Sequence, residues 1–137
     1  MFIVDTDVLS ATRRADKAPR VAAWLASVPD QDLFISVITI GEIERGIARQ
    51  QSVDPVFAGD LRRWLDATMT FFADRIVDFG AEDARIWGRL SVSIGHHGAD
   101  LMIAASALSR NATVATGNTA HFAPTGARTI NPFNVAA

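Results

Sequence analysis

Short apolar runs alternate in this sequence with longer segments whose apolar residues recur at helical spacing. The runs are rich in β-branched and aromatic residues and are too short for helices, which is typical of buried strands. They cover residues 2–4, 33–37 and 113–116, with weaker runs at 75–79 and 127–130. This alternation predicts an α/β fold with a mainly parallel central sheet flanked by helices. We expect a single domain over residues 1–137, because the chain contains no repeat, low-complexity tract or linker.

The intervals between the predicted strands carry helical periodicity. Ile40, Ile43 and Ile47 mark the inner face of one helix, for which Thr39 is the expected N-cap. Pro55 suits the first turn of the next helix. These helices would cover the sheet.

The composition excludes several classes of protein. The chain has no cysteine, so disulfides and thiolate metal sites are absent and a reducing compartment is expected. The N-terminus does not resemble a signal peptide, and no apolar run reaches membrane-spanning length. We therefore expect a cytoplasmic protein without a membrane partner. The net charge of −2 does not by itself indicate a nucleic-acid binder, although all basic residues but Lys17 are arginines, which suit phosphate contacts.

Polar side chains follow several of the predicted strands. Asp5 and Asp7 stand at the end of the first strand, and Glu42 lies in the first helical turn after the second. Asp100 begins a helix, and Asn118 comes two residues after the 113–116 strand. Because ligands of open parallel sheets bind at the carboxyl ends of the strands, these side chains could converge. Each acid could equally be a residue that favours the positive end of its own helix.

Helical geometry distinguishes some of these acids from their neighbours. Asp100 lies on one stripe with Ala104 and Ala107, so close packing of the alanines on the sheet would hold Asp100 at the sheet's rim. Glu42 lies opposite the isoleucine face of its helix, whereas Glu44 is nearer the apolar flank. The wheel favours Glu42 without settling the choice.

A cluster of carboxylates needs a cation, because like charges in one cleft repel each other. An all-oxygen cluster suits Mg²⁺ or Mn²⁺. One or two such ions could activate water and stabilise the leaving oxygen in phosphodiester cleavage.

Four ordered blocks, which span nearly the whole chain, resemble the motifs of PIN domains. They are Val4–Ser10, Ser36–Ile47, Asp100–Ala105 and Thr116–Phe122, and Asn131–Phe133 is similar to the usual ending. The resemblance is to the VapC-like toxins of type II toxin–antitoxin pairs. It implies a metal-dependent endoribonuclease that cleaves RNA, forms a homodimer and is held inactive by a cognate antitoxin.

The resemblance also implies roles for individual residues. By motif position, Asp5, Glu42 and Asp100 would be the metal ligands, and Asn118 the fourth catalytic residue. The supporting residues would be Thr6, Asp7 and Thr116. The chain departs from the family at Asp7, where Asn is usual, and at Asn118, where some members have an acid. The second departure leaves the number of metal ions open.

Some sequence features are compatible with other interpretations. The His96-His97 pair indicates a solvent-exposed turn more than a metal site, and a structural role is favoured for His121. A haloacid-dehalogenase-like phosphatase would need a downstream lysine, but Lys17 is the only lysine and comes too early. A catalytically silent PIN fold that binds RNA or a protein stays open, because Asn118 is not acidic.

Overall fold

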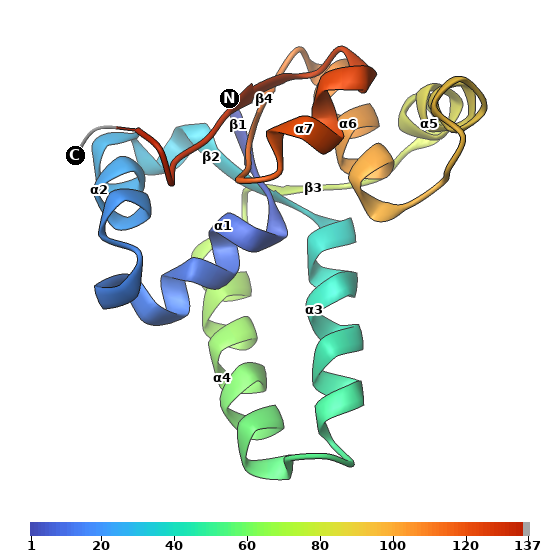
Figure 1. The fold of residues 1–137 in the computed structure, drawn as a ribbon. Coiled ribbons are helices and arrows are strands. Elements are labelled where there is room, and N and C mark those ends of the chain that lie inside the picture. Colours follow the sequence, from blue (N-terminus) through green and yellow to red (C-terminus); the bar gives the residue numbers. More distant parts are fainter. Residues whose placement is uncertain (136–137) are drawn as a thin grey trace.

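The computed structural model describes residues 1–135, and its centre is a five-stranded sheet in the order β3-β2-β1-β4-β5 (Figure 1). The strands are β1 (Phe2–Val4), β2 (Leu33–Ser36), β3 (Ile76–Val77), β4 (Thr113–Ala115) and β5 (Arg128–Ile130). Every neighbouring pair is parallel, which confirms the predicted α/β class. The predicted domain extends to residues 136 and 137, which lie outside the described residues.

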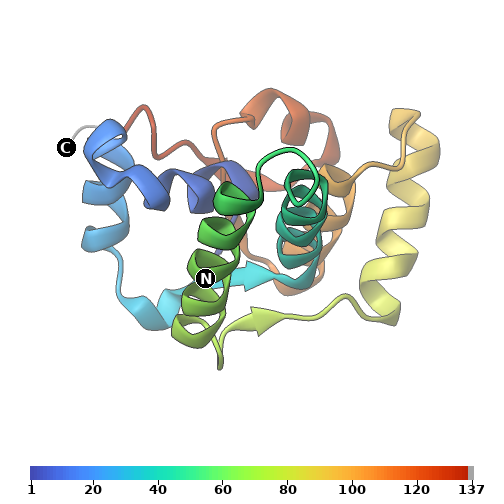
Figure 2. The same ribbon diagram turned by 90° about the horizontal axis from the view of Figure 1, so that it is seen from below.

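Helices connect the strands and cover the sheet. They are α1 (Thr6–Ala11), α2 (Pro19–Ser27), α3 (Val37–Gln50), α4 (Pro55–Phe71), α5 (Ala81–Ile94), α6 (Ala99–Arg110) and α7 (Thr119–Phe122). Short 3₁₀ segments are η1 (Thr12–Lys17), η2 (Asp30–Asp32) and η3 (Ala123–Thr125). Helices α3 and α4 run side by side away from the sheet, while α2 and α5 lie at opposite ends of the molecule (Figures 1 and 2). Within the described residues, no helix is long and apolar enough to cross a membrane.

Alternation along the strands divides the core between the two faces of the sheet. Ile3 and Val114 belong to a buried cluster with residues of α6 and α7. Val4 and Ala115, the next residues along the same strands, belong to a second cluster with residues of α1, α2, α3 and α4. Because successive strand side chains point to opposite faces, helices must cover both sides of this sheet.

The start of α3 differs from the sequence prediction. Ser36, not Thr39, is the N-cap, and its hydroxyl accepts a hydrogen bond from the backbone N–H of Ile38 at 3.0 Å. Thr39 is instead buried inside the helix. Since α3 begins at Val37, directly after β2, Glu42 lies in the second helical turn rather than in the first.

The strand predicted at 75–79 is shorter than expected. Only Ile76–Val77 is a strand. One residue further on, the carbonyl of Asp78 accepts a 3.0 Å hydrogen bond from the Arg110 guanidinium. Beyond Val77 the backbone is therefore bonded to a side chain of α6.

Candidate active site at the carboxyl edge of the sheet

Asp5 lies at the centre of the sheet's carboxyl edge. The chain passes from β1 to β2 and β3 on one side and then returns to β4 and β5 on the other. The carboxyl ends of β1 and β4 therefore flank the topological switch point, where open parallel sheets bind ligands. Asp5 directly follows β1 and Thr116 directly follows β4. The Thr116 hydroxyl donates a 2.7 Å hydrogen bond to Asp5 Oδ2, so the fold brings these two predicted site residues together.

The surroundings of Asp5 change its acidity. The side chain is almost fully buried, and its Oδ1 accepts a 2.8 Å hydrogen bond from the backbone N–H of Thr6. Burial raises the pKa of Asp5 to about 6; the hydrogen bond from Thr116 opposes the rise, and the charges of Asp7 and Asp100 add to it. This three-carboxylate group is therefore a site that a bound cation would stabilise.

Asp7 joins the loops that follow β1 and β4. Its Oδ1 accepts a hydrogen bond from the Val8 N–H and its Oδ2 one from the Gly117 N–H, both at 2.8 Å. A side chain at Gly117 would not fit, because a Cβ there would lie 2.7 Å from Asp7 Oδ2 and 3.0 Å from the Phe133 ring. Burial raises the pKa of Asp7, and these two backbone hydrogen bonds oppose the rise. Both oxygens of Asp7 are thus used as acceptors, which an asparagine with one oxygen cannot do.

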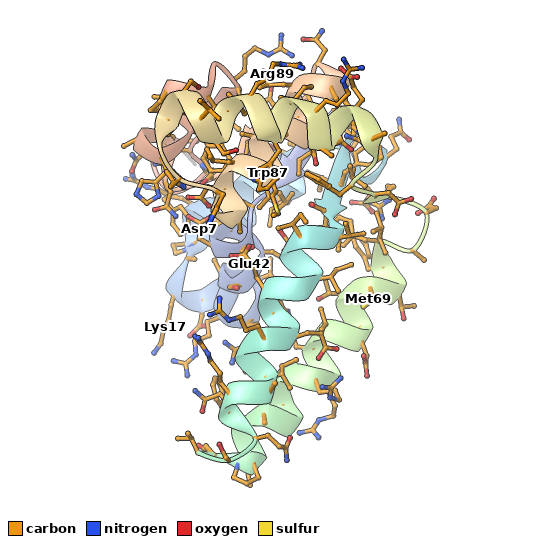
Figure 3. All side chains as sticks on the ribbon, turned by 90° about the vertical axis from the view of Figure 1, so that its right-hand side faces the viewer. Asp7, Lys17, Glu42, Met69, Trp87 and Arg89 are labelled. Carbon is orange, nitrogen blue, oxygen red and sulfur yellow. The ribbon has the colours of Figure 1, made fainter. Side chains whose placement is uncertain are left out.

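The contacts of α3 separate Glu42 from Glu44. Glu42 Oε1 accepts a 2.7 Å hydrogen bond from the Thr6 hydroxyl, which also lies 3.1 Å from the hydroxyl oxygen of Thr39. Figure 3 shows Glu42 on the side of α3 that faces the start of the chain. Glu44 instead forms a two-bond ion pair with Arg62 of α4, at 3.0 and 3.1 Å. Of these two acids, only Glu42 is joined to the segment that carries Asp5.

Asp100 and Asn118 occupy the rim of the same edge. Asp100 is the second residue of α6, and its Oδ2 lies 3.0 Å from Nδ1 of His121. Asn118 is exposed, and its backbone N–H donates a 2.9 Å hydrogen bond to the Thr116 hydroxyl. The sequence favours a structural role for His121, whereas the contact with Asp100 places its imidazole beside a candidate site residue. The sequence feature that could have indicated its nearness to the site is its position one helical turn after Asn118.

The donor set fits a hard divalent cation. Asp5, Glu42, Asp100 and Asn118 offer only carboxylate and amide oxygens, which are the donors that Mg²⁺ and Mn²⁺ take. Among residues 1–135, however, no three acidic, histidine or cysteine side chains are close enough to hold an ion as they stand. A cation held by one or two of these carboxylates would therefore complete its coordination with water or with substrate phosphate oxygens.

An all-parallel sheet covered by helices makes this chain an α/β protein, and its acidic residues lie at the switch point, where proteins of this class bind ligands. The profile of the PIN domain matches residues 2–126, so the chain belongs to the PIN-domain family.

Two relatives and one solved structure illustrate the similarity. The chain is 43% identical over 65 residues to ribonuclease VapC14 of Mycobacterium tuberculosis, over 47% of this chain and 63% of that relative. It is 30% identical to toxin FitB of Neisseria gonorrhoeae, over 98% of this chain and 99% of FitB. The crystal structure of FitAcB from the same organism superposes with a TM-score of 0.85 at 30% identity, covering 98% of this chain and all (100%) of that one. The alignment with VapC14 thus spans less than two thirds of that relative.

Proposed function

We propose that this protein is an endoribonuclease that hydrolyses phosphodiester bonds of RNA with the help of a divalent cation. The observation that carries the proposal is the gathering of acidic side chains at the switch point. Asp5 and Asp7 follow β1, Asp100 is near enough to act on the pKa of both, and Glu42 is joined to Thr6. Similarity to ribonuclease VapC14 supports the same activity.

The residues divide between holding the cation and fixing its ligands. Asp5, Glu42 and Asp100 would hold Mg²⁺ or Mn²⁺, which would supply activation of water and neutralisation of the charge that develops on the phosphate. Asn118 offers a further oxygen. Asp5 is oriented by Thr116 through a 2.7 Å bond, and Glu42 by Thr6 through another 2.7 Å bond. Such hydrogen bonds to ligands keep a site in its productive geometry.

A basic stripe on α3 supports a phosphate-containing substrate. Arg45 and Arg49 are three and seven residues after Glu42, so they share its helix face. Both are exposed, and neither forms an ion pair in the described part of the chain. They would hold phosphates next to the one that is cleaved.

The biological role that we propose is that of a toxin neutralised by a cognate antitoxin. Similarity to toxin FitB over nearly the full length supports this role. A nuclease that attacks cellular RNA must be held inactive in the cell that makes it, which is what an antitoxin partner would do. The homodimer and the cytoplasmic location stay predictions. The exposed apolar side chains single out no dimer face in the described part of the chain, since they are scattered over the N-terminus (Met1), the α3–α4 turn (Val53), the two ends of α4 (Val56, Phe71), α5 (Val92) and α6 (Leu108).

Three measurements test the proposal. Purified protein should cleave RNA in the presence of Mg²⁺ or Mn²⁺ and stop when EDTA is added. Asp5→Asn and Asp100→Asn should abolish cleavage while the circular dichroism spectrum is unchanged; wild-type rates in these variants would refute the assignment. Induced expression should arrest growth, and the product of an adjacent small gene should relieve the arrest. A protein that binds RNA or a partner but cleaves nothing and harms no cell would be the silent PIN module.

A further inference from the structure

His121 lies beside Asp100 because of how α7 is anchored. The next residue, Phe122, is fully buried in the cluster between the sheet and α6. The backbone N–H of His121 donates a 3.0 Å hydrogen bond to the carbonyl of Asn118, which fixes the single turn of α7. This places Nδ1 of His121 3.0 Å from Asp100 Oδ2, across 21 residues of sequence.

The chemistry of the pair fixes the direction of the bond. An ionised carboxylate only accepts hydrogen bonds, so Nδ1 of His121 carries the proton. The contact occupies Oδ2 of Asp100, while Oδ1 has no hydrogen-bond partner among residues 1–135. The side chains of His121 and Asp100 are 66% and 30% exposed, and pairs of this kind contribute little to stability. Stabilising the fold is therefore a poor explanation for the contact.

Asp100 differs from the other two acids in what orients it. Both oxygens of Asp5 accept hydrogen bonds, from Thr6 and Thr116. Both oxygens of Asp7 accept backbone hydrogen bonds. Asp100 has only the bond from His121, so without the imidazole its carboxylate would be free to rotate.

We propose that His121 is a positioning residue for Asp100, whose Nδ1–H holds Oδ2 and leaves Oδ1 for the metal ion. This inference rests on the proposed function, since it assigns His121 to the same cation site. Removing a residue that orients a metal-binding side chain lowers metal affinity or activity by about 10- to 100-fold.

Two substitutions of similar shape test the roles of the two ring nitrogens of His121 separately. The amide nitrogen of His121→Asn stands near the place of Nδ1 and can still donate to Asp100, whereas that of His121→Gln stands near the place of Nε2. His121→Ala removes both, and His97→Ala, in the exposed turn after α5, is the matched control. Mn²⁺ binding to each full-length protein is measured without RNA by electron paramagnetic resonance, and cleavage is then measured with RNA.

We expect Mn²⁺ binding and kcat to depend on a hydrogen-bond donor at the position of Nδ1. His121→Ala and His121→Gln should weaken Mn²⁺ binding and lower kcat by about 10-fold or more, with KM for RNA nearly unchanged. His121→Asn and His97→Ala should stay within about threefold of wild type, and all melting temperatures should agree closely. If the wild type cleaves no RNA but Mn²⁺ binding still follows this pattern, the ribonuclease proposal fails and the positioning role stands.

Three results would overturn the inference. Wild-type Mn²⁺ binding in His121→Ala would show that the imidazole does not position Asp100. Retained activity in His121→Gln together with loss in His121→Asn would assign the role to Nε2, and thus to direct contact with RNA. Failure of the wild-type protein to bind Mn²⁺ would remove the site that His121 is meant to arrange.

Discussion

The hydroxyl of Thr116 donates a 2.7 Å hydrogen bond to the carboxylate of Asp5, across 111 positions of sequence. The Thr116 hydroxyl also accepts a hydrogen bond from the backbone N–H of Asn118, so it links the ends of β1 and β4 across the switch point. Through these two bonds, the loop that leads to α7 is tied to the buried acid at the end of β1. The position of Asn118 and of His121 beyond it therefore depends on the same contact that orients Asp5.

Glu42 and Glu44 provide a matched test of the site. Glu42→Gln should reduce RNA cleavage by at least about 100-fold, because it removes the charge of a residue that we propose as a ligand of the cation. Glu44→Gln, two residues along the same helix, should leave the rate within about twofold, since it only weakens an exposed ion pair with Arg62. Single-turnover cleavage rates of both variants decide the matter. Equal losses in the two would contradict the choice of Glu42.

Asp5→Asn should stabilise the fold at neutral pH while it abolishes cleavage. The folded pKa of Asp5 is raised by burial from 3.8 to about 6. Between these values the folded protein keeps a proton that the unfolded chain has lost, so wild-type stability falls as the pH rises through this window. Above pH 6, ionisation of the buried Asp5 lowers the free energy of unfolding of the wild type by about 3 kcal/mol. Asp5→Asn avoids this cost, but the net gain is smaller because the amide makes weaker hydrogen bonds.

The measurement for Asp5→Asn is a set of thermal melts in EDTA from pH 4 to pH 8. The melting temperature of the variant should exceed that of the wild type most above about pH 6, and the difference should shrink toward pH 4. A difference in melting temperature that is the same at every pH would show that burial does not raise the pKa of Asp5.

Gly117→Ala should disrupt the contact between the two site loops. The added methyl would meet Asp7 Oδ2 at 2.7 Å and the Phe133 ring at 3.0 Å, so the loop has to shift. We expect a loss of about 1–3 kcal/mol in the free energy of unfolding and a strong loss of cleavage. Gly88→Ala in α5, where a Cβ meets nothing within 4 Å, should instead stabilise the protein by about 0.5–1 kcal/mol. Denaturant titrations compare the two; an unaffected Gly117→Ala would rule out the close approach.

Arg45 and Arg49 should affect substrate binding rather than chemistry. Arg45→Gln combined with Arg49→Gln should raise KM for RNA several-fold and reduce its dependence on salt, because fewer phosphates are neutralised. Arg89→Gln, on the exposed side of α5 (Figure 3), is the control and should change neither. KM measured at two salt concentrations gives the answer. An unchanged KM and salt dependence in the double variant would exclude this face of α3 as the RNA-binding surface.

Asp83 should be a structural acid with no part in cleavage. It is buried and accepts hydrogen bonds from Gly80, Ser109 and Arg110. Burial acts to raise the pKa of Asp83, but the hydrogen bonds, first that of Arg110, outweigh it and the pKa is lowered. Its contribution to stability is therefore complete above its ordinary pKa and is lost as the pH falls below that value.

Asp83→Ala should accordingly cost about 3 kcal/mol at pH 7, because it leaves Arg110 without its partner. The loss should be constant from pH 5 to pH 8. Glu82→Ala, at the exposed neighbouring position, should change stability by less than about 0.5 kcal/mol. Folded Asp83→Ala protein, assayed at low temperature, should retain its cleavage rate. A selective loss of activity in folded protein would mean that Asp83 acts in the site.

The pattern of residues along the chain was enough to predict most of the strands and helices and two of the candidate site positions. Strands and helices could be predicted because the spacing of apolar residues is a local property of the chain. Asp5 and Asp100 could be placed at the sheet's edge for the same reason, since one directly follows a strand and the other lies in the first turn of a helix. Thr39 was wrongly expected to be an N-cap, because the nearer hydroxyl of Ser36 starts the helix at the end of β2.

Which side chains meet depends on the folded chain and could not be predicted from local patterns. Glu44 is separated from Glu42 by its bond to Arg62 on α4, and Asp7 holds the Gly117 N–H across 110 residues. His121 reaches Asp100 because the buried Phe122 anchors α7 against the sheet. These contacts depend on the order of strands in the sheet, which sets the ends of β1 and β4 side by side. Local periodicity contains no information about that order, so the partners of the site residues appear only once the chain is folded.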